Sequence, residues 1–187
     1  MNYGNIKQND IANGEGVRVS LFVSGCTHHC KNCFNKETWD FSYGEPFTTE
    51  VWERIFGYCD HDYITGLTLL GGEPMEPQNQ RALLPFLREF KRRFPGKSIW
   101  CYTGFLYEQL TGEHRVNTEC TDEILSMLDI LVDGEFVDEL KSLGLRFRGS
   151  SNQRVIDVPA TRASGSVVLW SGVSEDKKYS DAKPVRD

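Results

Sequence analysis

Apolar side chains alternate with other side chains along residues 17–24, and this period of two predicts a strand with one buried face. The strand ends at Gly25, and Cys26 follows at once. Later apolar stretches predict further strands over residues 67–70, 99–102, 130–132, 154–158 and 166–170. The chain therefore contains enough predicted strands to build a central sheet.

Apolar residues at helical spacing fill three gaps between these strands. Threonines at two of the expected starts have side chains that cap helices well. Pro85 lies inside the longest pattern, and it predicts either a late start or a kink there. The predicted helices run from Thr48 or Thr49 to Cys59, over residues 78–94, and from Thr121 to Leu128.

Strands that alternate with helices favour parallel strands joined by right-handed crossovers, so the predicted fold class is α/β. In such sheets the chemistry collects where the strands end. Those ends carry the cysteine-rich segment 26–33, the pair Gly72-Glu73, Thr103 and Asp133. Polar or metal-binding features at one rim predict a functional site there.

The composition indicates one globular domain with a polar end. The chain has 187 residues, of which 39% are hydrophobic and 26% are charged, and this suffices for a single core. We expect residues 1–170 to form the domain and residues 171–187, rich in Ser, Asp and Lys, to form a flexible tail. The net charge of −6 argues against nucleic acid as a partner.

The sequence also argues against a membrane protein. It contains no apolar stretch of about 18 residues, the length that spans a bilayer. Residues 1–10 are polar and do not resemble a signal peptide. We therefore expect a cytoplasmic protein with no membrane partner, in a compartment that keeps thiols reduced. Six cysteines in that setting indicate metal or redox chemistry rather than disulfides.

Cys26, Cys30 and Cys33 follow the spacing CxxxCxxC. Thiolates are soft ligands that suit iron–sulfur clusters or zinc, and three of them leave one metal position open, as reactive sites do. The alternative is a zinc site completed by His28 or His29, which loop strain disfavours. We expect both histidines to be solvated or to lie beside the metal ligands. The remaining cysteines, Cys59, Cys101 and Cys120, are expected to be buried as small apolar residues.

A Gly-Gly-Glu-Pro turn over residues 71–74 ends the second predicted strand. Gly71 and Gly72 allow a backbone to approach a ligand closely, and the carboxylate of Glu73 can accept hydrogen bonds from an ammonium group. Gly-Gly is also common in ordinary turns, so the motif alone leaves a structural role open. Its place at the same rim as the cysteines favours a binding role.

The CxxxCxxC segment and the Gly-Gly-Glu-Pro turn together resemble the radical S-adenosylmethionine superfamily. Within it, further segments resemble the activating proteins of anaerobic (class III) ribonucleotide reductases. The likeness extends from about Asn13 to Val158, and Gly-Ser-Ser-Asn-Gln at residues 149–153 is particular to that family. It implies an incomplete parallel β/α barrel. The segments that carry the closer likeness are residues 13–26, 33–39, 100–105, 132–136 and 148–154.

The resemblance implies two cofactors. The first is a 4Fe-4S cluster in which Cys26, Cys30 and Cys33 hold three irons. The second is S-adenosylmethionine, whose amino and carboxylate groups chelate the fourth iron. The glycine turn, comprising Gly71, Gly72 and Glu73, is then expected to contact the methionine part of this cofactor.

The adenosine part of the cofactor is harder to place by resemblance. Many superfamily members have an aromatic residue just before the third cysteine, where this chain has Asn32. We therefore expect the adenine contact to come from Asn32, Cys33 and Phe34. Asp133 is expected either to hold a ribose hydroxyl or the methionine amine, or to be an ordinary turn residue.

The implied function is the activation of anaerobic ribonucleotide reductase. A low-potential electron donor of the flavodoxin or ferredoxin class reduces the cluster, and S-adenosylmethionine breaks into methionine and a 5′-deoxyadenosyl radical. This radical removes a hydrogen atom from a glycine of the reductase large subunit, and no side chain of the chain itself is expected to be catalytic. The alternatives are an activase of another glycyl-radical enzyme, such as pyruvate formate-lyase, and a non-catalytic iron–sulfur or zinc module.

A few other residues have open roles. Ser150, Ser151 and Asn152 are expected to bind the cofactor carboxylate, to contact the reductase or to cap a loop. Arg154 is expected at the surface rather than in a pair with a carboxylate. The tryptophans expected in the core are Trp39, Trp52 and Trp100.

Overall fold

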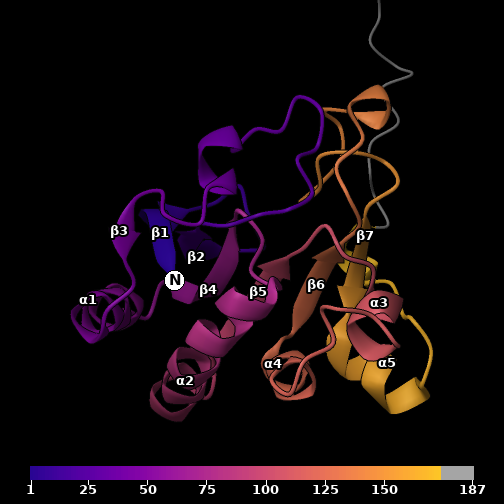
Figure 1. The fold of residues 1–187 in the computed structure, drawn as a ribbon. Coiled ribbons are helices and arrows are strands. Elements are labelled where there is room, and N and C mark those ends of the chain that lie inside the picture. The colour runs from indigo at the N-terminus through magenta and orange to yellow at the C-terminus, as the bar shows by residue number, and fades with distance from the viewer. Residues whose placement is uncertain (174–187) are drawn as a thin grey trace, which may run out of the picture.

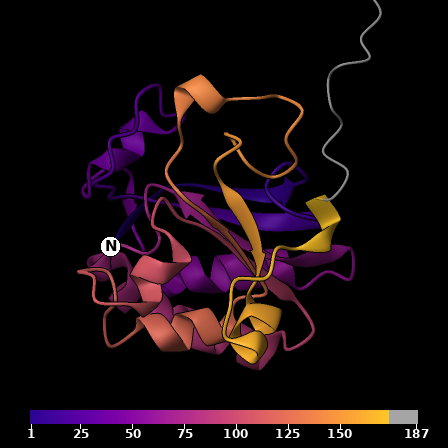
Figure 2. The ribbon, with the colours of Figure 1, turned by 90° about the vertical axis from the view of Figure 1, so that its right-hand side faces the viewer.

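The structure, a computed structural model, describes residues 1–173. Its centre is a mixed sheet of seven strands in the order β3-β1-β2-β4-β5-β6-β7. Helices pack along one face of this sheet, and long loops gather beyond one end of its strands (Figures 1 and 2). Because β3 and β7 are its edges, the sheet is open, and the predicted α/β class is confirmed without a closed barrel.

Four neighbouring strands form the parallel centre of the sheet and follow the predicted alternation with helices. Each strand but the last continues through a helix into the next, as parallel pairing requires. The strands are β2 (Val17–Val23), β4 (Ile64–Gly71), β5 (Ser98–Tyr102) and β6 (Ile130–Asp133), and the helices are α1 (Thr49–Cys59), α2 (Pro77–Arg93), α3 (Tyr107–Thr111) and α4 (Thr121–Met127).

Helix α2 passes through Pro85 without ending, so the predicted late start is wrong. Pro85 lies on the exposed side of the helix, where water can bind the carbonyl that loses its partner. The helix instead begins at Pro77, a residue whose missing N–H costs nothing in the first turn.

The antiparallel strand β1 (Asn2–Asp10) lies beside β2, and the short β3 (Glu45–Pro46) lies beside β1. The sequence did not predict β1, because its residues are mostly polar. Only Tyr3 and Asp10 are buried in it. Backbone pairing with β2, rather than an apolar face, holds this strand in place.

The last predicted strands are only partly correct. Strand β7 (Arg154–Asp157) is present but antiparallel to β6, and Val158 belongs to the next helix, α5 (Val158–Ser164). The predicted strand over residues 166–170 is wrong, because Leu169 forms a single bridge to Ile156 and the chain then enters the 3-10 helix η3 (Ser171–Val173). Residues 174–187 of the expected tail lie outside the described residues.

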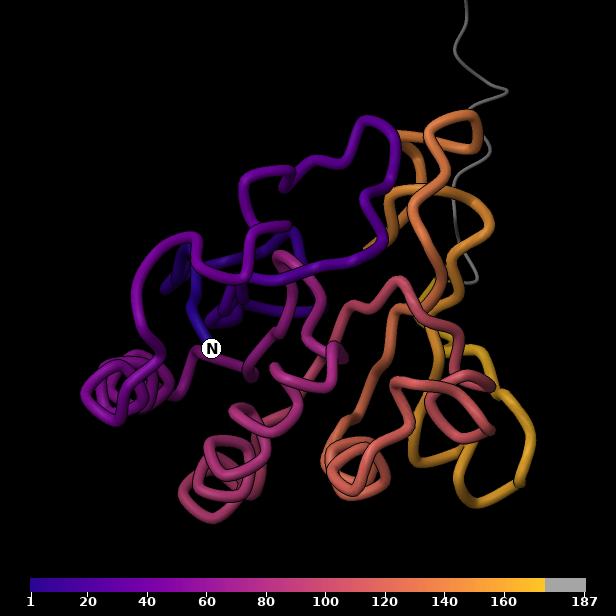
Figure 3. The backbone as a smooth tube through the Cα atoms, in the orientation of Figure 1, coloured from indigo at the N-terminus to yellow at the C-terminus, as the bar shows by residue number. Residues whose placement is uncertain are grey.

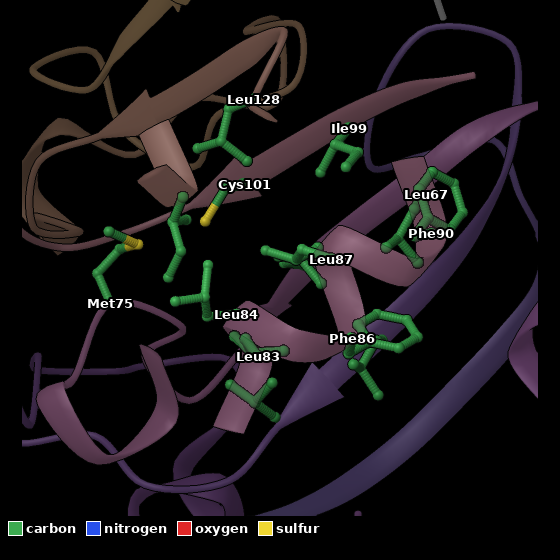
Figure 4. Packing of buried hydrophobic residues seen from close by; sticks show 14 of the residues in the cluster. Leu67, Met75, Leu83, Leu84, Phe86, Leu87, Phe90, Ile99, Cys101 and Leu128 are labelled. Carbon is green, nitrogen blue, oxygen red and sulfur yellow. The ribbon is translucent and has the colours of Figure 1, made fainter. Parts of the chain in front are cut away.

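The main core lies between the sheet and the helices (Figure 4). Leu87 and Phe90 of α2 are fully buried against Leu67 of β4 and Ile99 of β5. Burying such a side chain stabilises the fold by about 1.5–3 kcal/mol. Cys101 lies in the same core, and Cys59 and Cys120 are buried too, which confirms the expectation for these three cysteines.

The opposite face of the sheet encloses a charged residue, Arg18. Its side chain donates hydrogen bonds to Thr68 Oγ1 (2.7 Å), Leu67 O (2.8 Å) and Ser98 O (3.0 Å). Burial lowers the pKa of Arg18 to about 10. This value is still well above 7, and the guanidinium therefore stays charged at neutral pH. A small second cluster around Trp100 covers this end of the face.

No helix in the part of the chain that the structure describes is long and apolar enough to cross a membrane.

Candidate functional site

A cavity of about 620 Å³ lies where the parallel strands end. Its walls are the cysteine loop (residues 24–35), the glycine turn (residues 71–74), Thr103-Gly104 after β5, and the β6–β7 loop (residues 134–153). The violet cysteine loop and the orange β6–β7 loop meet above the sheet (Figure 3). This is the rim where parallel sheets bind ligands. The predicted residues that line it are Cys26, Cys30, Asn32, Cys33, Phe34, Gly71, Gly72 and Glu73.

The three clustered cysteines share this cavity. Cys26 is buried, whereas Cys30 and Cys33 are half-buried. Burial raises the pKa of the Cys26 thiol to about 12, and it also raises the pKa of Cys30. Within residues 1–173, no three His, Cys, Asp or Glu side chains are arranged to hold a metal ion as they stand. Three soft sulfur donors on one wall nevertheless fit an iron–sulfur cluster, whose irons favour the thiolate form.

Backbone hydrogen bonds fix the start of the cysteine loop. Gly25 N donates to Thr38 O at 2.8 Å, and Cys26 N donates to Trp39 O at 3.1 Å. Gly25 has a φ of 98°, and a Cβ at this position would lie 2.2 Å from the ring of Phe41. Only glycine fits both the left-handed conformation and the space. The strand end therefore delivers Cys26 to a defined place.

Glu76 anchors the next residue of the loop from the start of α2. Its buried carboxylate accepts hydrogen bonds from Thr27 N (3.2 Å) and from Arg115 Nη1 (2.9 Å). Burial opposes the ionisation of Glu76, but the hydrogen bonds from Arg115 and Thr27 outweigh it and lower the pKa of this carboxyl. The loop is thus tied to helix α2 by a charged contact.

The glycine turn packs directly on the backbone of the cysteine loop. Gly72 N donates to Val23 O at 2.7 Å, and Glu73 N donates to Gly25 O at 2.8 Å. A Cβ at Gly72 would lie 2.7 Å from Gly25 O and 2.8 Å from Thr38 O. The two segments are therefore one unit, and this contact explains why position 72 needs glycine.

The carboxylate of Glu73 is enclosed, with 1% of the residue exposed. It accepts hydrogen bonds from Met75 N (2.8 Å) and Gly104 N (2.7 Å), and it lies 3.2 Å from Nε2 of His28. Glu73 therefore connects the ends of β4 and β5 with the cysteine loop. Each carboxylate oxygen can accept more than one hydrogen bond, so capacity for a ligand remains.

Asn32 and Phe34 lie on the outer part of the cysteine loop. Asn32 has a φ of 56°, and its Nδ2 donates to Asp138 Oδ2 at 2.7 Å. Phe34 lines the cavity and is 87% exposed. Asn35, which the sequence did not single out, donates from Nδ2 to Gly71 O at 3.3 Å. These contacts join the outer part of the cysteine loop to the β6–β7 loop and to the glycine turn.

Asp133 is the predicted site residue that the structure does not bring to the cavity. Its buried carboxylate accepts hydrogen bonds from Arg154 Nε (2.9 Å) and from Tyr107 N (2.8 Å). Arg154 also pairs with Glu108 at 2.7 Å, so the expectation of an unpaired surface arginine is wrong. Asp133 therefore connects the end of β6 with β7 and α3. Of the two roles that the sequence left open, these contacts match the structural one.

The Gly-Ser-Ser-Asn-Gln motif fastens the base of the β6–β7 loop. Gln153 Oε1 accepts hydrogen bonds from Gly149 N (2.8 Å) and Ser150 N (3.1 Å), and its Nε2 donates to Gly134 O (2.9 Å). Asn152 Nδ2 donates to Glu135 O at 2.8 Å. Ser150, Ser151 and Asn152 do not line the cavity, so these contacts match the loop-capping role.

The histidines of the cysteine loop are engaged by the protein. His28 Nδ1 lies 2.7 Å from Glu135 Oε1, and the ring of His29 stacks on Trp39 at 4.6 Å between centroids. These contacts do not favour a zinc site completed by either histidine. Trp39 is half-buried and lines the cavity, so its place is not the expected core. Trp100 is buried as expected, and Trp52 packs on the main core half-buried.

Sequence reasoning gave His28 only a solvated place or one beside the metal ligands, and it missed the middle of the β6–β7 loop as a part of the site. The spacing of the cysteines predicted the three sulfur ligands, but it gave no information on which side chains contact the histidine between them. Between the segments 132–136 and 148–154, which the resemblance singled out, the loop has no motif, although Leu143 and Leu145 there line the cavity. A loop of about 20 residues inside a short chain was the available signal, because loops of this length are often functional.

Comparison with known proteins gives a consistent picture. A family model described as a 4Fe-4S single cluster domain matches residues 12–156. An anaerobic ribonucleoside-triphosphate reductase-activating protein of Haemophilus influenzae is 41% identical over 155 residues, covering 82% of this chain and 96% of that protein. Proteins of the same name are 39% identical in Escherichia coli strain K12 (83% and 97% covered) and 38% identical in Enterobacteria phage T4 (83% and 93% covered). The chain therefore matches a 4Fe-4S single cluster domain and belongs to the family of anaerobic ribonucleoside-triphosphate reductase-activating proteins.

Proposed function

We propose that this protein is a radical S-adenosylmethionine enzyme that activates an anaerobic ribonucleoside-triphosphate reductase by generating a glycyl radical on it. The observation that carries the proposal is one cavity lined by Cys26, Cys30, Cys33 and the glycine turn, in a chain of this family. The open sheet is compatible with an incomplete barrel over residues 1–170. The reducing compartment that such thiolates need is the cytoplasm.

Each wall of the cavity has a task in this proposal. Cys26, Cys30 and Cys33 hold the cluster. The glycine turn, ordered by Glu73, binds the amino and carboxylate groups of S-adenosylmethionine, and Phe34 offers an exposed ring to the adenine. Asp133 has no part, because Arg154 and Tyr107 occupy its carboxylate.

The cofactors supply the chemistry, and the chain positions them. When held by Cys26, Cys30 and Cys33, the cluster would take one electron from a flavodoxin or ferredoxin class donor and would supply it for the reductive cleavage of S-adenosylmethionine. The products would be methionine and, after a hydrogen atom is taken from a reductase glycine, 5′-deoxyadenosine. The residues of the chain exclude water and hold the sulfonium beside the cysteines. The β6–β7 loop borders the path by which a glycine of the partner reaches the cavity.

The test begins with protein that has been reconstituted and purified without oxygen. Iron and sulfide analysis should give one 4Fe-4S cluster per chain, and a reductant with S-adenosylmethionine should yield 5′-deoxyadenosine and methionine. Addition of the anaerobic reductase should then produce a glycyl radical signal in electron paramagnetic resonance. Zinc without labile sulfide contradicts the proposal, and a radical on pyruvate formate-lyase alone assigns a different client.

A further inference from the structure

The side chain of His28 is largely enclosed, although it lies between two of the clustered cysteines. Its side chain is 7% exposed, and its ring packs on Phe105 with 4.2 Å between centroids. Gly104 also touches the ring, since a Cβ at that position would lie 2.6 Å from Nε2 of His28. The place of the imidazole and the lack of a side chain at position 104 therefore depend on each other.

The two ring nitrogens of His28 face carboxylates from two different segments. Nδ1 lies 2.7 Å from Oε1 of Glu135 in the β6–β7 loop, and Nε2 lies 3.2 Å from Oε2 of Glu73 in the glycine turn. The second contact is within ion-pair distance without the alignment of a hydrogen bond. One imidazole on the cysteine loop thus touches two other walls of the cavity.

The neighbouring side-chain contacts between the cysteine loop and the β6–β7 loop are exposed. Lys31 Nζ lies 2.7 Å from Glu139 Oε1, with these side chains 71% and 65% exposed. Asn32 bonds to Asp138 at the surface in the same way. Exposed pairs contribute little to stability, because water and salt compete with them. The His28 contact differs in that the imidazole itself is enclosed, with 7% of its side chain exposed, although its loop partner Glu135 is 58% exposed.

We propose that His28 is a positioning residue that holds the β6–β7 loop over the cavity and fixes it relative to Glu73. With the imidazole in place, the loop keeps the cavity in the shape that receives S-adenosylmethionine beside the cysteines. The identity of this ligand rests on the function proposed above. His28 acts here through Glu73 and Glu135 rather than on the reacting atoms.

The first experiment measures hydrogen–deuterium exchange of amides 136–145 in the anaerobic, cluster-loaded protein. His28→Phe keeps the ring packing but loses both carboxylate contacts, and Glu135→Ala removes the loop partner. Both variants should exchange about tenfold faster there, the effect of losing one charge-assisted hydrogen bond. Glu139→Ala, which breaks the exposed pair with Lys31, is the matched control and should change the rate less than twofold. His28→Asn, with an amide near Glu135, should restore part of the protection.

The second experiment measures the affinity for S-adenosylmethionine by calorimetry, together with iron per chain. His28→Phe and Glu135→Ala should bind the cofactor about tenfold more weakly, and Glu135→Ala should keep its iron. Unchanged exchange in both variants overturns the proposal. Iron loss in Glu135→Ala that matches its loss of affinity also overturns it, because the contact then serves only to fold the cysteine loop. If the unaltered, iron-loaded protein binds no S-adenosylmethionine, the proposed function fails, and the exchange comparison alone decides the role of His28.

Discussion

The two faces of the central sheet bury different kinds of side chain. On the face covered by helices, Phe86 and Leu87 are fully buried among apolar neighbours. On the other face, Arg18 is enclosed, and the hydroxyl of Tyr102 is buried without a hydrogen-bond partner among the described residues. Apolar burial stabilises a fold directly, whereas a buried polar group costs free energy unless it is paired. Stability therefore comes mainly from the helix-covered face, whereas Tyr102 on the other face lines the cavity at the strand ends.

Cysteine substitutions should separate the two faces most strongly. Cys26→Ala, Cys30→Ala and Cys33→Ala should each abolish assembly of the cluster, because each removes a proposed ligand. Cys101→Ala on the helix-covered face should keep the iron and cost about 1 kcal/mol of stability. Iron and sulfide analysis after anaerobic reconstitution checks this, and iron loss in Cys101→Ala would show that the proposed ligand set is wrong.

Phenylalanine substitutions compare the faces by stability. Phe86→Ala should lower the free energy of unfolding by about 3–5 kcal/mol, because it leaves a cavity among fully buried neighbours. Phe34→Ala at the cavity, where the ring is 87% exposed, should change it by less than about 0.5 kcal/mol. Denaturant unfolding measures both values, and equal effects would remove the distinction between the faces.

Glu76, which anchors the cysteine loop from the start of α2, offers a smaller and pH-dependent effect. Glu76→Gln should cost about 1–3 kcal/mol, because it removes a charged hydrogen-bond acceptor from the Arg115 and Thr27 contact. The pKa of Glu76 is lowered in the folded protein, so its contribution is present at neutral pH and is lost as the pH falls below its ordinary value of 4.5 and through the folded value.

Unfolding free energies measured from neutral to acidic pH test this prediction. The pH dependence in the acid range should be weaker in Glu76→Gln than in the unaltered protein. Glu119→Gln, which alters an exposed pair with Arg81, is the matched control and should leave most of the stability in place. A larger loss from the exposed pair than from Glu76 would contradict the assigned anchor.

The smallest expected effect is at Tyr102. Tyr102→Phe removes a buried hydroxyl that has no partner in the described structure, so stability should stay the same or rise by up to about 1 kcal/mol. Tyr3→Phe is the control, since its hydroxyl donates to Glu45 Oε2 at 2.7 Å and its loss should cost about 1 kcal/mol. Thermal unfolding of the pair distinguishes these results, and a clear loss in Tyr102→Phe would reveal a hidden partner.

The sequence predicted the elements that have a strong apolar pattern. The parallel strands and helices α1, α2 and α4 were found because each has a buried stripe. Strand β1 was missed because pairing with β2, not an apolar face, defines it. Helix α5 was missed although Asp157 and Gly165 are good capping residues, because only Val158 and Thr161 are buried in it and it has no stripe of large apolar residues.

The candidate site was predictable where spacing along the chain is informative. The cysteines and the glycine turn are local motifs, and both line the cavity. Asp133 was included because it ends a strand at the same rim, but the direction of its side chain depends on Arg154, a residue of another strand. His28 was expected to be solvated or to lie beside the metal ligands, and its contacts were missed because its partners, Glu73 and Glu135, are distant in sequence. Contacts of this kind follow from the fold and not from local pattern.

The shared backbone hydrogen bonds of Gly72 and Glu73 with Val23 and Gly25 have a practical consequence for protein engineering. The two pieces, residues 23–25 and residues 72–73, lie about fifty positions apart in the chain, yet they pack backbone against backbone with no side chain between them. A chimera that takes one piece from one relative and the second from another would join mismatched surfaces. Grafting the cysteine loop into a new host therefore requires both pieces to be transplanted together.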